Sequence, residues 1–180
     1  MKKILLAALA VAGVAATPAL ATLSAGANAP DFTVHGYMAG KPFTFNLDEA
    51  LKKGPVVLYF FPAVHTGGCN LEAHLFAEAA DDFKKEGATV IGVTAGNLDQ
   101  LAQFSTETQY CSGKFPVAAD ADLKVAKTYD AILAMKVTDR TSYLITPDHK
   151  VTYAYHAMNP TKHVENTMDA LKKWEADHHS

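Results

Sequence analysis

The sequence predicts an α/β fold in which a central sheet is covered by helices on both faces. Residues 55–61 are apolar at every position, which is typical of a strand that is buried on both sides. Residues 88–93 form a second apolar run, and the segment between the two runs has apolar residues at helical spacing. Strand, helix and strand in this order predict a βαβ unit with parallel strands.

A short hairpin is predicted before this unit. Its strands cover 32–35 and 43–45, on either side of the glycine-containing bend GYMAGKP. The helix of the βαβ unit follows Gly67 and Gly68 and ends at Gly87, a residue type that readily adopts the left-handed conformation of a helix C-terminus. The apolar positions of this helix are Leu71, Leu75, Phe76, Ala79 and Phe83.

The middle of the chain is predicted to form two further helices. Asn97 or Asp99 can cap the first of them, which ends near Cys111. An extended piece follows at 115–119, and a shorter helix covers about 122–129. The apolar residues of the first helix are Leu98, Leu101 and Phe104.

The last third of the chain predicts an antiparallel hairpin and a closing helix. The strands cover 141–145 and 151–155, around a turn at 147–150. Asn159 is predicted to cap the closing helix, with Pro160 at its first position. Its apolar stripe consists of Val164, Met168, Leu171 and Trp174. Together these elements predict a thioredoxin-like three-layer sandwich with a central mixed sheet and an N-terminal hairpin.

Residues 1–21 are predicted to be a secretory signal peptide. Lys2 and Lys3 precede a run of small and apolar residues that is shorter than the roughly 20 residues of a membrane-spanning helix. The ending Ala-Leu-Ala favours cleavage after Ala21, with cleavage after Ala29 or an uncleaved anchor as alternatives. Residues 22–180 would then form a single domain that is exported, in a bacterium to the periplasm, with no stable membrane association.

The charge of the chain argues against some classes of partner. Without Lys2 and Lys3, 14 of the 16 basic residues remain against 19 acidic ones, so the formal charge is −5. Nucleic-acid-binding domains usually have a net positive charge, so no nucleic-acid partner is expected. The eight histidines, among them His65, His178 and His179, are interpreted as solvated side chains, so no metal site or cofactor is expected.

One of the two cysteines, Cys69, follows a predicted buried strand at the start of a helix. Reactive groups gather at this edge of α/β sheets. Unpaired backbone N–H groups and the positive end of the helix dipole favour a thiolate there, and Gly67 and Gly68 allow close approach of the backbone. The position therefore indicates a reactive nucleophile, with a structural disulfide to Cys111 as the alternative.

Two other thiol chemistries of this fold fit the loop less well. Dithiol exchange requires a second cysteine three residues away, where the chain has Thr66 and Glu72. A copper-delivery site would have a second cysteine four residues away, where the chain has His65 and Ala73. Such a site would keep His156 as its distant ligand but lack one of its soft sulfur ligands.

Several stretches resemble the peroxiredoxins of the AhpC/TSA family. Pro62, Thr66 and Cys69 reproduce the signature P-x-x-x-T-x-x-C, and Arg140 begins the stretch RTSYLI, which is similar to the family's R-x-S/T-F/Y-hydrophobic-I. The stretch APDF at 29–32 resembles the usual start of the family, and CNLEA is similar to the bacterioferritin-comigratory (PrxQ) branch. The likeness covers essentially the whole chain after the signal peptide.

The resemblance implies a thiol-dependent peroxidase that reduces hydrogen peroxide or organic hydroperoxides through a sulfenic acid at Cys69. Arg140 would hold the peroxide and favour the thiolate, Thr66 would orient the substrate, and Pro62 would screen the sulfur from water. Glu72 would either share in catalysis or only stabilise the dipole of the first helical turn. Alternatively, Thr66 acts mainly as an N-cap, and Arg140 pairs with a surface carboxylate.

The resolving step departs from the pattern of many relatives in this branch, because position 74, five residues after Cys69, is histidine. Cys111 would resolve the sulfenic acid as an internal disulfide; if Cys111 is a bystander, an external thiol must do so. The expected partners are a peroxide and a thiol reductant, either a thioredoxin-like protein or a small thiol, acting on a monomer or homodimer. The alternative function is an exported thioredoxin-like redox sensor or a metal-binding, copper-chaperone-like module without peroxidase turnover.

Overall fold

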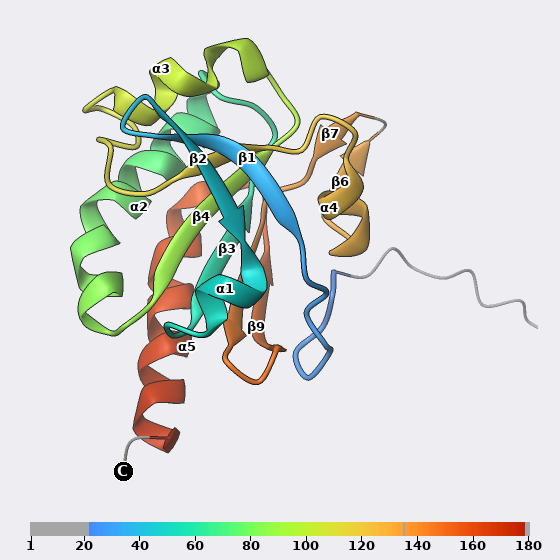
Figure 1. Cartoon of the computed structure of the whole chain (residues 1–180), viewed down its shortest axis with the longest axis vertical. Coiled ribbons are helices and arrows are strands. Elements are labelled where there is room, and N and C mark those ends of the chain that lie inside the picture. Colours follow the sequence, from blue (N-terminus) through green and yellow to red (C-terminus); the bar gives the residue numbers. More distant parts are fainter. Residues whose placement is uncertain (1–21, 135, 179–180) are drawn as a thin grey trace, which may run out of the picture.

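The computed structural model describes residues 22–134 and 136–178 (Figure 1). The predicted signal peptide, residues 1–21, lies outside the described residues. Within the described part, no helix is both long enough and apolar enough to cross a membrane.

A seven-stranded sheet forms the middle layer of the molecule. Its strands are β1 (Thr33–Met38), β2 (Lys41–Asn46), β3 (Val56–Phe60), β4 (Thr89–Thr94), β5 (Val117–Ala119), β8 (Thr141–Thr146) and β9 (Lys150–His156). They lie in the order β2-β1-β5-β4-β3-β8-β9. β3, β4 and β5 pair in parallel, and the other pairs are antiparallel. The predicted mixed sheet and its parallel βαβ unit are thus confirmed.

Helices cover both faces of this sheet (Figure 1). Those on one face are α2 (Gly67–Lys85), α3 (Leu101–Thr106) and α5 (His163–His178), and those on the other are α1 (Leu47–Leu51) and α4 (Lys124–Thr128). The central strand β3 is buried at every position and separates two apolar clusters. Val56, Leu58 and Phe60 pack on the α1 and α4 side, whereas Val57 and Tyr59 pack on the α2 and α5 side. A strand with an apolar residue at each position is what such a two-sided core requires.

The predicted stops and caps are largely confirmed. Gly87 has a φ of 72° and follows the end of α2. Asn159 accepts a hydrogen bond from the Thr161 backbone N–H at 3.1 Å, and the chain then forms the 3₁₀ turn η2 (Pro160–Lys162) before α5. Asn97 occupies the N-cap position of η1 (Leu98–Gln100), as predicted for the start of this helix, but its side chain makes no capping bond and instead donates its amide to the Val64 carbonyl at 2.9 Å.

The N-terminal hairpin is longer than predicted, because β1 and β2 continue through the expected bend to a tight turn at Ala39 and Gly40. Both turn residues have positive φ, 51° and 74°. Helix α1 and the small pair β6 (Ile132–Ala134) and β7 (Val137–Thr138) were not predicted. Each is five residues or shorter, too short for hydrophobic periodicity to reveal.

The predicted helix that ends near Cys111 is wrong at its C-terminal end. α3 stops at Thr106, and residues 107–113 form turns in which Ser112 and Gly113 have positive φ. The 3₁₀ turn η1 (Leu98–Gln100) directly precedes α3. Cys111 therefore lies in a turn segment between α3 and β5. α4 is likewise shorter than the predicted 122–129.

Candidate active site

Cys69 lies in the first turn of α2, just beyond the end of β3, and its side chain is 1% exposed. The position agrees with the prediction of a thiol at a strand-to-helix junction. Gly68 allows the close approach expected of it, since a Cβ there would lie 3.0 Å from Arg140 Nη2. A Cβ at Gly67 would meet nothing within 4 Å, so the same prediction for Gly67 is wrong.

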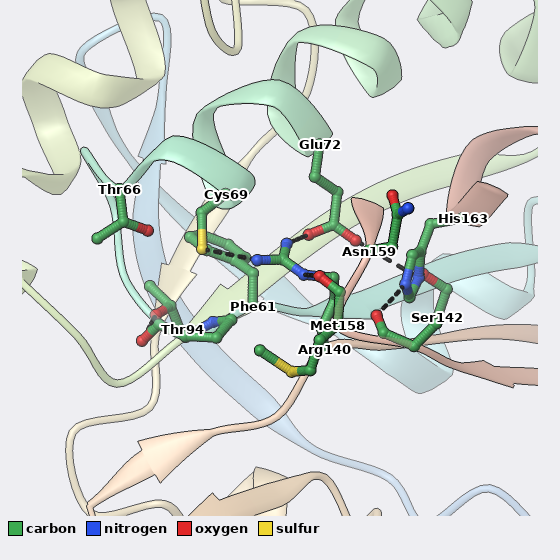
Figure 2. Close-up of polar contacts among 12 residues, drawn as sticks. Phe61, Thr66, Cys69, Glu72, Thr94, Arg140, Ser142, Met158, Asn159 and His163 are labelled. Carbon is green, nitrogen blue, oxygen red and sulfur yellow. Dashed lines mark hydrogen bonds and ion pairs between the residues drawn. The ribbon is translucent and has the colours of Figure 1, made fainter. Parts of the chain in front are cut away.

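Arg140 immediately precedes β8 and reaches Cys69 from the neighbouring strand (Figure 2). Its Nη2 donates to Cys69 Sγ at 3.3 Å, its Nε donates to the Met158 carbonyl at 3.0 Å, and its Nη1 donates to Glu72 Oε2. The side chain is 3% exposed, and three acceptors, of which Cys69 and Glu72 are buried, hold the guanidinium in one orientation. The alternative that Arg140 pairs with a surface carboxylate is wrong, because its carboxylate partner is buried.

Glu72 is fully buried on α2 and pairs with Arg140. It lies beyond the first turn of the helix, so the alternative role in the helix dipole is not supported. Burial raises the pKa of Glu72 to about 8, although the nearby charge and hydrogen bond of Arg140 act in the opposite direction. A buried carboxyl with so high a pKa beside a thiol is typical of functional sites.

Thr66 and Pro62 shape the loop in front of Cys69. Thr66 has the extended backbone of an N-cap residue, but its hydroxyl makes no capping bond and instead donates to the Ala63 carbonyl at 3.0 Å. Its oxygen lone pairs therefore stay available beside Cys69 (Figure 2). Pro62 is half-buried, and its carbonyl accepts a hydrogen bond from Thr94 Oγ1 at 3.1 Å. The interpretation of Thr66 as mainly an N-cap is not supported.

His65 is not the solvated side chain that the sequence suggested. Its ring is 21% exposed, and its two nitrogens lie 2.6 Å from Gln100 Oε1 and 2.6 Å from Glu107 Oε2. The hydrogen bond to Glu107 raises the pKa of His65, because both ring nitrogens face acceptors when the imidazolium forms. This pair, the His65–Glu107 clasp, joins the Cys69 loop to the turn segment that carries Cys111.

Cys111 is fully buried, and both cysteines are free thiols in this structure. Its side chain belongs to the same apolar cluster as Cys69, Phe104 and Phe115. Burial raises the pKa of the Cys111 thiol, so this sulfur is neutral in the folded protein. Local opening of the turn segment must therefore precede any reaction of Cys111.

The sequence did not single out two further polar residues of the site, Ser142 and His163. His163 was interpreted as solvated, but it is fully buried at the start of α5, where its Nδ1 lies 2.8 Å from Ser142 Oγ and 3.5 Å from Glu72 Oε1. Helical spacing could have placed it on the buried face, since His163, Thr167 and Leu171 are four residues apart and all three are buried.

Within the described residues, no three histidine, cysteine or acidic side chains come together in a way that could hold a metal ion. His156, the distant ligand of the copper alternative, instead pairs with Asp139 Oδ2 at 2.7 Å. The arrangement of Cys69 therefore fits thiol chemistry with a charged neighbour better than a soft-metal site.

The family profile described as AhpC/TSA matches residues 25–154 of the chain. The chain belongs to this family. Chloroplastic peroxiredoxin Q of Arabidopsis thaliana is 31% identical over 155 residues, which cover 84% of this chain and 68% of that protein. Peroxiredoxin Bcp of Xanthomonas campestris is 25% identical over 124 residues, 65% of this chain and 76% of that protein.

Solved structures agree with this assignment. The crystal structure of peroxidoxin BcpB from Mycobacterium tuberculosis is 27% identical with a TM-score of 0.72, and the match covers 84% of this chain and 97% of that one. The reduced 2-Cys peroxiredoxin of Plasmodium vivax shares the fold, with a TM-score of 0.77 at 18% identity over 87% of this chain and 99% of that one. The predicted thioredoxin-like fold and PrxQ/Bcp branch are confirmed, and this peroxiredoxin is a thiol-dependent peroxidase that uses a peroxide and a thiol reductant.

Proposed function

We propose that Cys69 is the residue that attacks the peroxide and that Cys111 resolves the resulting sulfenic acid. The observation that carries the proposal is the hydrogen bond of 3.3 Å from Arg140 Nη2 to Cys69 Sγ in a buried site. A fixed positive charge beside sulfur favours the thiolate, which is the nucleophilic form. The substrate is hydrogen peroxide or an organic hydroperoxide.

The first step is a displacement at oxygen. The Cys69 thiolate forms an S–O bond to one peroxide oxygen while the O–O bond breaks, and the second oxygen leaves with the electron pair as hydroxide or alkoxide and takes up one proton. Sulfur is oxidised by two electrons to a sulfenic acid, and the peroxide is reduced by two electrons. Arg140 stabilises the negative charge that spreads over the breaking bond, and the Thr66 hydroxyl orients the peroxide.

The second step closes a disulfide. The Cys111 thiol attacks the Cys69 sulfenic sulfur, an S–S bond forms, and the sulfenic oxygen leaves as water. Both sulfurs are buried on helix α2 and in the segment 107–113, so both must leave their pockets first. A thioredoxin-like protein or a small thiol then returns two electrons and restores both thiols.

The proposed site of action is the periplasm of a bacterium, after cleavage following Ala21. What supports it is the sequence of residues 1–21, where two lysines precede a short apolar run that ends in Ala-Leu-Ala. The reductant then has to be a thiol system of that compartment, and the protein acts there as a monomer or homodimer.

Rapid mixing of the reduced protein with hydrogen peroxide, followed by mass analysis of the denatured product, tests the proposal. We expect the intact chain to yield a Cys69–Cys111 disulfide, and Cys111→Ser to yield a sulfenic acid that is trapped by an added thiol. Unchanged peroxide consumption by Cys69→Ser would refute the role of Cys69. A mixed disulfide of the intact chain with added thiol, and no internal link, would refute the role of Cys111.

A further inference from the structure

The two carboxyl oxygens of Glu72 have different surroundings. Oε2 accepts a hydrogen bond from Arg140 Nη1, whereas Oε1 is buried and has no hydrogen-bond partner. His163 Nδ1 lies 3.5 Å from that oxygen (Figure 2). A negatively charged oxygen without a donor is costly in a buried site, and a proton on it removes this cost.

His163 has no N–H to offer to Glu72. Its Nε2 lies 2.8 Å from the Ala157 carbonyl oxygen, which only accepts, so Nε2 carries the hydrogen of the neutral ring. Its Nδ1 accepts from the Ser142 hydroxyl at 2.8 Å. Burial lowers the pKa of His163 to about 4, which keeps the ring neutral at physiological pH. Nδ1 therefore offers no hydrogen to Glu72 Oε1, 3.5 Å away, so two acceptors oppose each other unless one of them holds a proton. A proton on Oε1 would share the Nδ1 lone pair with the Ser142 hydroxyl.

We propose that one proton is held between Glu72 Oε1 and His163 Nδ1, so that Glu72 meets Arg140 as a neutral carboxylic acid while Cys69 is a thiolate. His163 and Ser142 are then positioning residues, since their contacts are with each other and with Glu72 and not with the sulfur. The inference rests on the proposed role of Cys69 and deepens it.

The charges around Glu72 support a neutral carboxyl. It faces Arg140 at the start of β8, Cys69 on its own helix, the Tyr59 phenol from β3 and His163 from α5. Two anions, Glu72 and the Cys69 thiolate, would share one guanidinium in a buried site if Glu72 were ionised. With Glu72 neutral, the charge of Arg140 is balanced by the thiolate alone. Burial correspondingly raises the pKa of Glu72 to about 8.

The groups around His163 leave it neutral. After burial, which dominates, the nearby positive charges of Arg140 and His156 also disfavour its imidazolium form, while Asp139 and the bond to Ala157 favour that form. The Tyr155 ring covers its side, with ring centroids 4.8 Å apart. The proton of the pair is consequently held on the carboxyl oxygen and not on the imidazole.

The first step changes the protonation of the site in a way that can be measured. Attack converts the thiolate to a neutral sulfenic acid, and the leaving hydroxide or alkoxide takes up one proton. Once the thiolate charge has disappeared, Arg140 is free to stabilise an ionised Glu72, whose proton leaves through solvent and balances the one taken up. Near pH 7 the first step should therefore take up about zero protons from the medium, against about one for a thiolate site without such a donor.

Proton uptake should be measured with a pH indicator in weak buffer, with the reduced full chain carrying Cys111→Ser so that the reaction stops at the sulfenic acid. We expect an uptake near zero, and an uptake near one proton when Glu72→Gln is added, because an amide has no proton to release. Uptake near one without Glu72→Gln would overturn the proposal. Uptake near zero in both proteins would also overturn it, because the proton would then come from a neutral Cys69 thiol.

The roles of His163 and Ser142 have separate signatures in infrared difference spectra. The protonated carboxyl band of Glu72 should be present in the reduced protein and vanish on oxidation. In a pH titration of the reduced protein, the band should disappear as Glu72 ionises. His163→Phe removes the acceptor and should move this disappearance to lower pH, whereas Ser142→Ala frees Nδ1 for Glu72 and should move it to higher pH. Merely structural effects would not produce opposite shifts. His35→Phe, at an exposed histidine of β1, is the control and should leave the band unchanged.

Failure of this inference and failure of the proposed function look different. If Cys69 does not attack peroxide, no sulfenic acid appears and no peroxide is consumed. If only the shared proton is wrong, peroxide is consumed at Cys69 with a net uptake of about one proton in the presence of Glu72. Where His163→Phe does not fold, the Glu72→Gln and Ser142→Ala measurements decide the question.

Discussion

The two cysteines are almost equally buried, at 1% and 0% exposure for Cys69 and Cys111, yet their surroundings differ in kind. Cys69 accepts a hydrogen bond from a guanidinium that is itself held by Glu72 and the Met158 carbonyl. Cys111 lies in an apolar cluster within a turn segment, where burial raises its pKa. Burial by itself therefore does not determine how reactive a cysteine is; the partners inside the pocket do.

The difference supports the proposed order of events. A thiol that is neutral and shielded cannot compete for peroxide, so in this proposal Cys111 reacts only after its segment has opened. The His65–Glu107 clasp joins that segment to the Cys69 loop, with each side chain 21% exposed. A side-chain contact of 2.6 Å therefore connects the segment that carries Cys111 to the loop that carries Cys69.

The largest expected effect comes from exchanging each sulfur for oxygen. Cys69→Ser should lower the rate of peroxide consumption by on the order of 10⁴-fold, because the nucleophile is lost. Cys111→Ser should leave the first burst of peroxide consumption unchanged and abolish only the internal disulfide. Single-turnover kinetics with a stoichiometric peroxide assay measure both. Equal losses in the two variants would remove the distinction between the regions.

Removal of the guanidinium should have the next largest effect. Arg140→Met should slow sulfenic acid formation by about 10²–10³-fold, the usual cost of a lost electrostatic stabiliser. Arg140→Lys should recover only part of this, since an ammonium cannot bind Cys69, Glu72 and Met158 at once. The second-order rate constant with hydrogen peroxide provides the measurement. A full rate in Arg140→Met would mean that the helix terminus alone activates the sulfur.

Two neighbouring glycines offer a matched pair. Gly68→Ala introduces a Cβ 3.0 Å from Arg140 Nη2, so the guanidinium must move by a few tenths of an ångström, and we expect a loss of about threefold to tenfold in the rate of peroxide attack. Gly67→Ala meets nothing within 4 Å and should keep the full rate. Both substitutions should raise helix propensity alike, so thermal melting serves as the control.

The smallest expected effect concerns the clasp. Glu107→Gln should speed formation of the internal disulfide by about 1.5-fold to fivefold, since a partly exposed ion pair contributes about 0.2–1 kcal/mol. The pair with Glu107 raises the pKa of His65 and lowers the pKa of Glu107, so the ion pair is complete at mildly acidic pH, where Glu107 is ionised and His65 is protonated, and is lost as pH rises through the folded-state pKa of His65. The effect of the substitution should therefore shrink as pH increases.

Disulfide formation after a saturating peroxide pulse, followed by quenched alkylation, measures this step. Glu49→Gln breaks the exposed pair of Glu49 with Lys52 on α1 and serves as the control, with no expected change. A slower disulfide in Glu107→Gln would show that the clasp guides Cys111 toward Cys69 and does not hold it back.

Local sequence signals predicted most of the fold and named several candidate residues of the site. Hydrophobic periodicity revealed β3, α2, β4 and the closing hairpin, because a buried strand or an amphipathic helix needs that pattern wherever it lies. The position of Cys69 indicated a nucleophile, and the resemblance to the AhpC/TSA family added Pro62, Thr66, Glu72 and Arg140 as candidates. The same signals missed α1, β6 and β7, whose few residues hold little more than one period, and they extended α3 into a segment that turns at Ser112 and Gly113.

What the sequence by itself determined is the position of a cysteine at a strand-to-helix junction and of an arginine that immediately precedes a later strand. Only the tertiary structure decided which side chains share the pocket with them. Glu72 and His163 are far apart in the chain and meet because α2 and α5 pack on the same face of the sheet, where both side chains lose contact with water. Protonation states depend on burial and on neighbours from other elements, and both arise only when the chain has folded.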